Sequence, residues 1–265
     1  MEKLLLVDGH NLLFQMFFGM PARILGRTNK PVHAVIGFVG ALLKVIKHVE
    51  PTSILVIYDG EQRINRSDHH PDYKANRESF QDVVDQENPF SQLADIKNVL
   101  DHLSIKHFET SGGYETDDYI ASYAEKFGEK TKIIIVSSDT DFLQLVNPNV
   151  SLYVYRGKNS VIYNEQKIIE RYGIESRYLA DYKALMGDKS DNIKGAPKVG
   201  PKTAARLIHQ YGGLNSIFEE IDHVKPPFIQ ASLLENRDRV TGDLKLIKLD
   251  GQVGLPFQIN DISYT

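Results

Sequence analysis

Acidic residues follow three apolar runs of the sequence, in a pattern that could hold metal ions. The acids are Asp8 after Lys3–Val7, Asp59 after Ser53–Tyr58, and Asp139 and Asp141 after Ile133–Val136. Open α/β sheets bind ligands at the carboxyl ends of their strands, so these carboxylates should meet at one rim. So many like charges cannot lie together without cations, which predicts a metal site. Any one of these aspartates alone is also explained as a helix cap or a turn residue.

Two further groups of acids lie in turns that open helices. Glu115, Asp117 and Asp118 follow a Gly-rich turn, and Asp188 and Asp191 lie three residues apart in a later turn. Acids at a helix N-terminus complement the helix dipole, which accounts for any one of them. Three together exceed what capping requires, so we interpret the first group as metal ligands or as groups beside ligands. The second pair could cap the next element or point at the metal rim.

The segment from Gly60 to Gln92 is polar and has few apolar anchors. Loops of this length inside compact domains tend to be functional or disordered. Its cations stand near Tyr73 and are Arg63, Arg66, Lys74 and Arg77. Basic residues with an aromatic ring suit a nucleic-acid strand, whose phosphates need neutralising and whose bases can stack. An ordinary solvated surface loop is the alternative.

A glycine-bracketed turn from Gly195 to Gly200 opens a helix at Pro201, which is a favoured first helical residue. Backbone N–H groups at such a turn, aided by the helix dipole, bind a phosphate without reading the base sequence. Lys198 and Lys202 add positive charge. We interpret this helix–turn–helix as a sequence-independent grip on a duplex backbone, with a plain αα-hairpin as the alternative.

The composition is that of a globular protein of 265 residues, 42% of them hydrophobic, which can bury one large core with a small appended module. The absence of cysteine excludes disulfides and thiolate metal sites and fits a reducing compartment. No signal peptide is visible, and no apolar run approaches the ~20 residues of a membrane span. We therefore expect a cytoplasmic protein without a membrane partner. The net charge of −4 does not decide for or against nucleic acid, because the distribution of charge matters more.

Segments with the apolar pattern of a strand alternate with segments that have the apolar spacing of a helix. This order predicts an α/β fold with a central, mostly parallel sheet flanked by helices. Strands are expected at Lys3–Val7, Ser53–Tyr58, Ile105–Glu109, Ile133–Val136, Asn149–Tyr155 and Ser160–Tyr163. Helices are expected at Leu12–Met20, Ala34–Val49, Phe90–Leu103, Asp118–Phe127, Glu165–Tyr172, Arg177–Met186 and Pro201–Tyr211. The remainder, from Leu214, is expected to be helical and then irregular.

With these motifs the sequence resembles the 5′ nucleases, the 5′–3′ exonucleases and flap endonucleases that include the N-terminal domain of bacterial DNA polymerase I and its stand-alone relatives. The resemblance runs from Leu4 to about Phe218, with the motifs in the family's order. The matching acids are Asp8, Asp59, Glu115, Asp117, Asp118, Asp139, Asp141, Asp188 and Asp191. Arg66, Tyr73, Lys74 and Arg77 match the segment that forms an arch in the family. Any one motif is weak, but nine acids in register with the arch and the DNA grip are highly specific.

The resemblance implies a resolvase-like, PIN-like nuclease core over residues 1–175, including an arch at 60–92. A helical DNA-binding module would follow over residues 176–265, with a helix–three-turn–helix at 177–213. Because no polymerase domain follows in this sequence, we expect the free-standing form. We also expect a monomer.

The resemblance further implies a structure-specific 5′ nuclease of DNA replication and repair that cleaves 5′ ends, nicks and 5′ flaps. Two Mg²⁺ ions, which Mn²⁺ should be able to replace, would be held by the nine acids, and similar proteins bind K⁺ at the helix–three-turn–helix. Lys74 and Arg77 would act on the scissile phosphate as electrostatic catalysts. The remaining DNA contacts would be Arg66, Tyr73, Gly195, Lys198, Gly200, Lys202 and Thr203.

Two positions depart from the family pattern. Gln15 stands where the family often has an arginine, and Ile64-Asn65-Arg66 stands where it commonly has Thr-Phe-Arg. These changes could weaken contacts to the 5′ portion of the substrate or alter substrate preference. The competing functions are a small-substrate phosphatase that uses the Asp-x-Asp pair, a non-catalytic protein that binds branched DNA, and a PIN-like ribonuclease.

Overall fold

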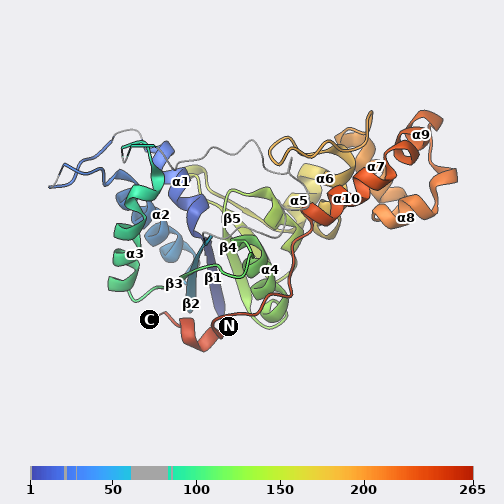
Figure 1. The fold of residues 1–265 in the computed structure, drawn as a ribbon. Helices are drawn as coiled ribbons and strands as arrows, with labels where there is room; N and C mark the ends of the chain where they lie inside the picture. The colour runs from blue at the N-terminus through green and yellow to red at the C-terminus, as the bar shows by residue number, and fades with distance from the viewer. Residues whose placement is uncertain (1, 21–22, 28, 61–82, 85, 265) are drawn as a thin grey trace.

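The computed structural model describes residues 2–20, 23–27, 29–60, 83–84 and 86–264, and its centre is a six-stranded sheet of order β3-β2-β1-β4-β5-β6 (Figure 1). All neighbouring strands are parallel except β6, which pairs antiparallel with β5. The strands are β1 (Lys3–Asp8), β2 (Ser53–Tyr58), β3 (Lys106–Glu109), β4 (Lys132–Val136), β5 (Val150–Val154) and β6 (Val161–Tyr163). The predicted α/β fold class is therefore confirmed.

The central strand β1 is apolar at every position from Leu4 to Val7 because both of its faces are covered. Leu4 and Leu6 belong to one hydrophobic cluster, and Leu5 and Val7 belong to the other. This alternation follows from the two-residue period of a strand, which sends successive side chains to opposite faces.

Helices cover the two faces unequally. The first face carries α1 (Gly9–Gly19), α2 (His33–Val49) and α3 (Leu93–His102), and the second carries α4 (Thr116–Phe127) (Figure 1). The apolar stripe of α2, including Phe38 and Leu42, is fully buried against the sheet. Among the helices that the structure describes, we find none with the length and apolar character to cross a membrane.

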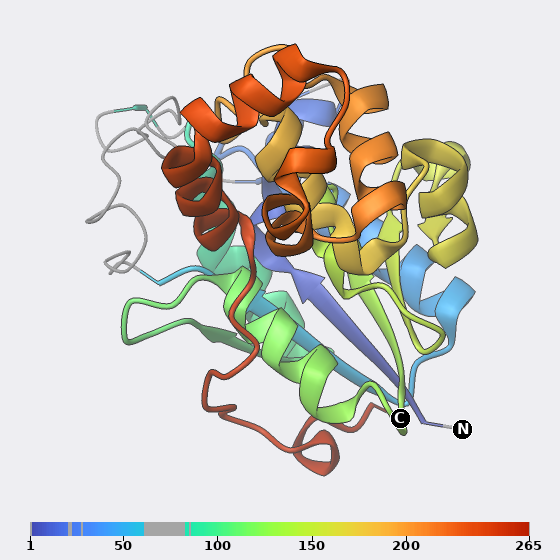
Figure 2. The same ribbon diagram turned by 90° about the vertical axis from the view of Figure 1, so that its right-hand side faces the viewer.

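The C-terminal half adds a helical lobe beside the carboxyl ends of the strands (Figures 1 and 2). Its helices are α5 (Glu165–Tyr172), α6 (Leu179–Met186), α7 (Pro201–Tyr211), α8 (Leu214–Glu219), α9 (Pro227–Glu235) and α10 (Arg237–Ile247). Its buried side chains, such as Leu185 and Leu207, belong to the same hydrophobic cluster as Leu4 and Leu6 of the sheet. The lobe and the sheet thus share one apolar core.

After α10 the chain returns along α4 to the end of the sheet where the chain begins, as both ribbon views show (Figures 1 and 2). We call residues 248–264 the C-terminal strap. The Val253 N–H donates to Ser122 Oγ at 2.9 Å, and the hydroxyl of Tyr123 donates to the Phe257 carbonyl at 3.1 Å. At its end, the Tyr264 N–H donates to the Thr52 carbonyl at 2.8 Å.

The predicted elements are present, with differences at their ends. Helix α1 begins at Gly9 rather than at Leu12, because Asp8 caps it. The helix predicted from Phe90 is a 3₁₀ turn, Pro89–Gln92, followed by α3, and the one predicted from Arg177 begins as a 3₁₀ turn at Ser176–Tyr178. Short 3₁₀ turns are common at helix N-termini, and apolar spacing does not distinguish them from α-helix. Residues 61–82, with most of the predicted arch, lie outside the described residues.

Candidate metal centre and nucleic-acid interface

The carboxyl ends of β1, β2 and β4 bring Asp8, Asp59 and Asp139 to one rim of the sheet, and we call these three residues the rim acids. Asp8 is the last residue of β1 and the N-cap of α1, where its Oδ1 accepts the Asn11 N–H at 3.0 Å. Its Oδ2 accepts the hydroxyl of Ser137, which follows β4, also at 3.0 Å. The Asp8 carboxylate is therefore fixed between two neighbouring strands.

Asp8 is buried, and burial raises its pKa from the ordinary 3.8 to about 7. The charges of Asp59 and Asp139 act in the same direction, whereas its two hydrogen bonds act in the opposite one. The influence of both charges agrees with the placement of the three carboxylates at one rim.

Asp139 caps the 3₁₀ turn Thr140–Leu145, with its Oδ1 accepting the Asp141 N–H at 2.8 Å. Asp59 is tied to α4, because its Oδ1 accepts the Thr116 N–H at 2.8 Å. The first turn of α4 thus lies against the rim, and it brings Glu115 and Asp117 with it.

Asp118, by contrast, uses its carboxylate on backbone groups. Its Oδ2 accepts the Glu115 N–H and its Oδ1 accepts the Asp250 N–H, both at 3.2 Å. The first bond closes the N-terminus of α4, and the second holds the C-terminal strap. This geometry gives Asp118 a structural task beside the rim, and its assignment to the metal site stays a prediction.

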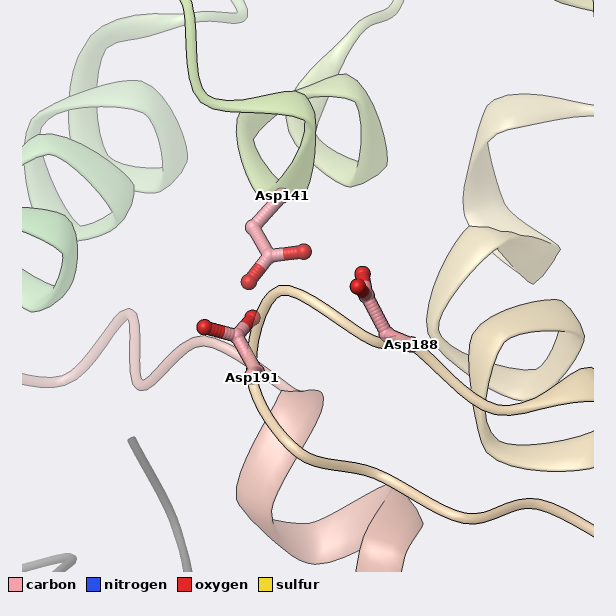
Figure 3. Close-up of side chains that lie close together, drawn as sticks. All are labelled: Asp141, Asp188 and Asp191. Carbon is pink, nitrogen blue, oxygen red and sulfur yellow. The ribbon is translucent and has the colours of Figure 1, made fainter. Parts of the chain in front are cut away.

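A second group of carboxylates converges where the helical lobe meets the sheet. Oxygens of Asp141, Asp188 and Asp191 all lie within 4.8 Å of one another, and Figure 3 shows the three side chains pointing toward a common centre. We call them the three-aspartate cluster. Asp141 comes from the 3₁₀ turn after β4, while the other two come from the loop between α6 and α7. Asp141 and Asp191 are buried.

The loop that presents Asp188 and Asp191 depends on glycines at its ends. Gly187 has φ +85° and Gly195 has φ +63°, which is the left-handed region that favours glycine. A Cβ on Gly195 would lie 2.2 Å from the backbone nitrogen of Gly187, so no side chain fits there. Asp188 and Ile193 exchange backbone hydrogen bonds of 2.9 and 2.7 Å across the loop. These constraints fix the direction of both aspartates.

Lys183 of α6 lies beside the three-aspartate cluster and was not among the predicted site residues. It is buried, its ammonium pairs with Asp141, and it lies 2.8 Å from Asp188 Oδ2. Burial acts to lower the pKa of Lys183, but the two carboxylates outweigh it and raise that pKa above its ordinary value. The only signal in the sequence was a lysine inside an apolar helical run, which is also typical of an exposed position.

Burial and neighbouring charges also change the pKa values of two aspartates in the cluster. Burial and the Asp139 charge raise the pKa of Asp141 to about 6, although the Lys183 ammonium opposes them. Burial also acts to raise the pKa of Asp188, but hydrogen bonds from Lys183 and Ser190 lower it below the ordinary value. Among the described residues, the Lys183 ammonium supplies one positive charge to a cluster of three carboxylates.

The acids at the rim and in the cluster fit a hard divalent cation. Every ligand atom offered is a carboxylate oxygen, which Mg²⁺ and similar ions prefer. Burial disfavours the ionised forms of Asp8 and Asp141, and a bound cation would favour them. The predicted residues Asp8, Asp59, Glu115, Asp117, Asp139, Asp141, Asp188 and Asp191 can therefore serve as its ligands or neighbours.

The turn before α7 forms one wall of a cleft on the helical lobe, which we call the basic cleft. Its lining residues are Lys198, Thr203, Arg206, Lys225, Pro226, Phe228 and Ile229. Two of these, Lys198 and Thr203, were predicted to bind DNA. Phe228 is 53% exposed, and the Lys198 ammonium lies 5.8 Å from its ring centre. The sequence did not indicate that residues at the start of α9 line this cleft, because the basic and aromatic residues of that segment are too few to form a motif.

The other predicted DNA contacts have different surroundings. Gly195 is buried at the start of the turn, Gly200 caps α7, and Lys202 is exposed in the first turn of that helix. The predicted contacts in the arch, which are Arg66, Tyr73, Lys74 and Arg77, lie outside the described residues, as does the Asn65 departure. At the other departure, the Gln15 amide donates to the Tyr155 carbonyl after β5.

Comparisons with known proteins match residues 3–265 of the chain in two parts. Residues 3–173 match the "5′-3′ exonuclease, N-terminal resolvase-like domain", and residues 174–265 match the "5′-3′ exonuclease, C-terminal SAM fold". A 5′-3′ exonuclease of Aquifex aeolicus is 32% identical over 263 residues, which cover 99% of this chain and 86% of that protein. DNA polymerase I of Streptococcus pneumoniae is also 32% identical, over 273 residues. This chain spans 30% of that polymerase, and 26% of the DNA polymerase I of Caldicellulosiruptor bescii.

Solved structures share the fold. The D15 protein of bacteriophage T5, co-crystallised with metal ions, has a TM-score of 0.77 and 22% identity over 94% of this chain and 90% of that one. The T5 D15 flap endonuclease in a pseudo-enzyme-product complex with DNA and metal ions has a TM-score of 0.75 and 24% identity, over 94% of this chain and 90% of that one. The catalytic core of Rad2 with a DNA substrate has a TM-score of 0.60 and 15% identity, with 98% of this chain and 84% of that one covered. Both the mostly parallel sheet and the helical lobe therefore occur together in other proteins.

Proposed function

Since the chain belongs to the 5′–3′ exonuclease family, we propose that it is a divalent-metal-dependent, structure-specific nuclease that hydrolyses DNA at 5′ ends and 5′ flaps. The observation that carries this proposal is the convergence of carboxylates from three strands and from the Gly187–Gly195 loop at one end of the sheet. The names of the relatives and structural neighbours, which include exonucleases, a flap endonuclease and DNA complexes, support the choice of substrate.

We assign two Mg²⁺ ions, replaceable by Mn²⁺, to the rim acids and the three-aspartate cluster. Asp8, Asp59, Glu115, Asp117, Asp139, Asp141 and Asp191 would hold or steer them, with Asp118 and Asp188 beside them. When bound, such ions activate water and stabilise charge on phosphate oxygens. The protein's own part is to hold these carboxylates in fixed directions, which the hydrogen bonds to Asp8 and Asp59 already do.

The basic cleft supplies the DNA grip in this proposal. Lys198, Arg206 and Lys225 carry charge for neighbouring phosphates, and the Thr203 hydroxyl can donate to one of them. None of these groups reads a base pair, so binding should depend on salt and on DNA structure rather than on sequence. Lys74 and Arg77 would contact the scissile phosphate. We also include a K⁺ ion at the turn before α7 in this proposal.

The test is cleavage of a duplex with a 5′-labelled single-stranded flap, with and without Mg²⁺, reading product length. A released flap of defined length supports endonuclease action, and release of mononucleotides or very short pieces supports exonuclease action. Asp139→Asn should abolish cleavage while duplex binding persists, because it removes charge at the rim and leaves the basic cleft intact. Full activity in that variant, or cleavage without a divalent ion, would contradict the metal assignment.

Two other outcomes would favour the competing functions. Tight binding of branched DNA without any Mg²⁺-dependent product would indicate a non-catalytic DNA-binding protein. Ready cleavage of RNA with resistance of branched DNA would indicate a PIN-like ribonuclease.

A further inference from the structure

His10 lies between two aromatic rings at the edge of the rim. It is the second residue of α1, and its ring centre lies 5.4 Å from that of Tyr58 and 5.2 Å from that of Phe90. Only 12% of its side chain is exposed. An apolar side chain would suit these neighbours, so the polar imidazole at this place requires an explanation.

The imidazole accepts a backbone hydrogen bond from one of the rim acids. The Asp59 N–H donates to His10 Nδ1 at 3.3 Å, and the same nitrogen lies 3.7 Å from Asp59 Oδ2. Because Nδ1 accepts, the ring proton must be on Nε2. That atom is buried and has no hydrogen-bond partner among the described residues. Within the described part of the chain, the imidazole thus leaves a buried donor without a partner and presents its acceptor to Asp59.

Asp59 is also fixed from its other side. Its Oδ1 accepts the Thr116 N–H at 2.8 Å, and the next residue, Gly60, donates its N–H to Thr110 Oγ1 at 2.9 Å. A Cβ on Gly60 would lie 2.0 Å from the Thr110 carbonyl oxygen, so the backbone packs closely against the end of β3. His10 supplies the matching constraint from the α1 side, where it holds the backbone nitrogen from which the Asp59 side chain departs.

We propose that His10 is a positioning residue that holds Asp59 in the direction needed to bind a divalent ion. This inference rests on the proposed function, because it assigns Asp59 to the metal site. His10 follows Asp8 by two residues on α1, so one short segment places an acid from β1 and orients an acid from β2. Groups that orient metal ligands commonly change metal affinity by about 10- to 100-fold when they are removed.

Two variants of similar size separate this role from simple packing. His10→Asn can place its amide oxygen near the position of Nδ1 and keep the bond from Asp59, whereas the longer side chain of His10→Gln places its amide near Nε2. Binding of Mn²⁺ to the DNA-free protein, followed by electron paramagnetic resonance, is the readout. We expect His10→Gln to weaken Mn²⁺ binding by about 10-fold and His10→Asn to retain affinity within about threefold of the wild type.

A double-mutant cycle with Asp59→Asn tests whether His10 acts through Asp59. If it does, His10→Gln should add no further loss of Mn²⁺ affinity in the Asp59→Asn background. Equal affinity of His10→Gln and the wild type would overturn the inference, and so would independent, additive losses in the cycle. Thermal unfolding of each variant identifies one that fails to fold, and the Asn variant alone then decides, because loss of affinity in a folded His10→Asn contradicts the role.

The inference and the proposed function can fail separately. A wild-type protein that cleaves flaps with Mg²⁺, while His10→Gln binds Mn²⁺ normally, refutes the inference and leaves the function intact. A wild-type protein that binds Mn²⁺ in a His10-dependent way but cleaves no DNA refutes the function and leaves the inference intact.

Discussion

Replacing Asp8 by asparagine should stabilise the metal-free protein, and increasingly so as pH rises. The pKa of Asp8 is raised from 3.8 to about 7, chiefly by burial. The contribution of this carboxyl to stability is therefore fully present below pH 3.8 and is lost as pH rises through about 7. An asparagine has no such dependence, because it does not ionise.

The magnitude follows from the difference between the ordinary pKa of 3.8 and the pKa of about 7 in the folded protein, which corresponds to about 4 kcal/mol of lost folding free energy at high pH. This figure already includes the hydrogen bonds from the Asn11 N–H and the Ser137 hydroxyl, because both bonds lower the pKa of Asp8 against the effect of burial. The gain at about pH 8 is therefore about 4 kcal/mol, or about 8–16 °C in Tm. At about pH 5.5 the gain should fall to about 2 kcal/mol.

The assay is thermal unfolding of both proteins in a chelator across this pH range, repeated with saturating Mg²⁺. Added Mg²⁺ should raise the Tm of the wild type more than that of Asp8→Asn, because only the wild type gains an ionised ligand. A difference in Tm that stays constant from about pH 5.5 to pH 8, or a variant less stable than the wild type at pH 8, would refute the reasoning.

Three further substitutions test other parts of the structure. Lys183→Met should destabilise the metal-free protein by about 3–5 kcal/mol, since Asp141 and Asp188 lose the ammonium between them; calorimetry in EDTA measures this, and an unchanged Tm would contradict the pairing. Lys202→Ala should weaken duplex binding equally for unrelated sequences and reduce the salt slope by about 1, as fluorescence anisotropy at several salt concentrations would measure. A loss that depends on DNA sequence would speak against the backbone grip. Asp118→Ala should cost about 2 kcal/mol in urea unfolding, because two backbone N–H groups lose their acceptor, and wild-type stability would argue against that role.

The sequence predicted the sheet because strands buried on both faces leave a strong local pattern. The apolar runs Lys3–Val7, Ser53–Tyr58 and Ile133–Val136 correspond to β1, β2 and β4. The acids after them had to meet at one rim once the strands were parallel, and the structure brings the rim acids together there. The start of α1 was predicted too late, because the capping role of Asp8 depends on the position of its side chain.

Interactions between distant segments left little trace in the sequence. Lys183 pairs with Asp141, 42 residues away, and nothing in its own helix distinguishes it from an exposed lysine. The Asp118 carboxylate accepts a hydrogen bond from the Asp250 N–H, 132 residues away. The sequence around Asp118 shows only an acid at the start of a helix, which suggested a position near the metal site. The contribution of Phe228 to the basic cleft depends in the same way on how α9 packs. Such roles follow from tertiary contacts, which single-sequence patterns do not encode.

The course of the C-terminal strap has a mechanical consequence. The chain enters the helical lobe after β6 and leaves it through residues 248–264, which are bonded along α4 and at Thr52. Two covalent connections, together with the shared apolar core, prevent the lobe from swinging on a single hinge. The basic cleft and the rim acids therefore keep a constant separation. Under the proposed function, that separation would set how many nucleotides lie between the phosphate bound in the cleft and the phosphate at the carboxylates.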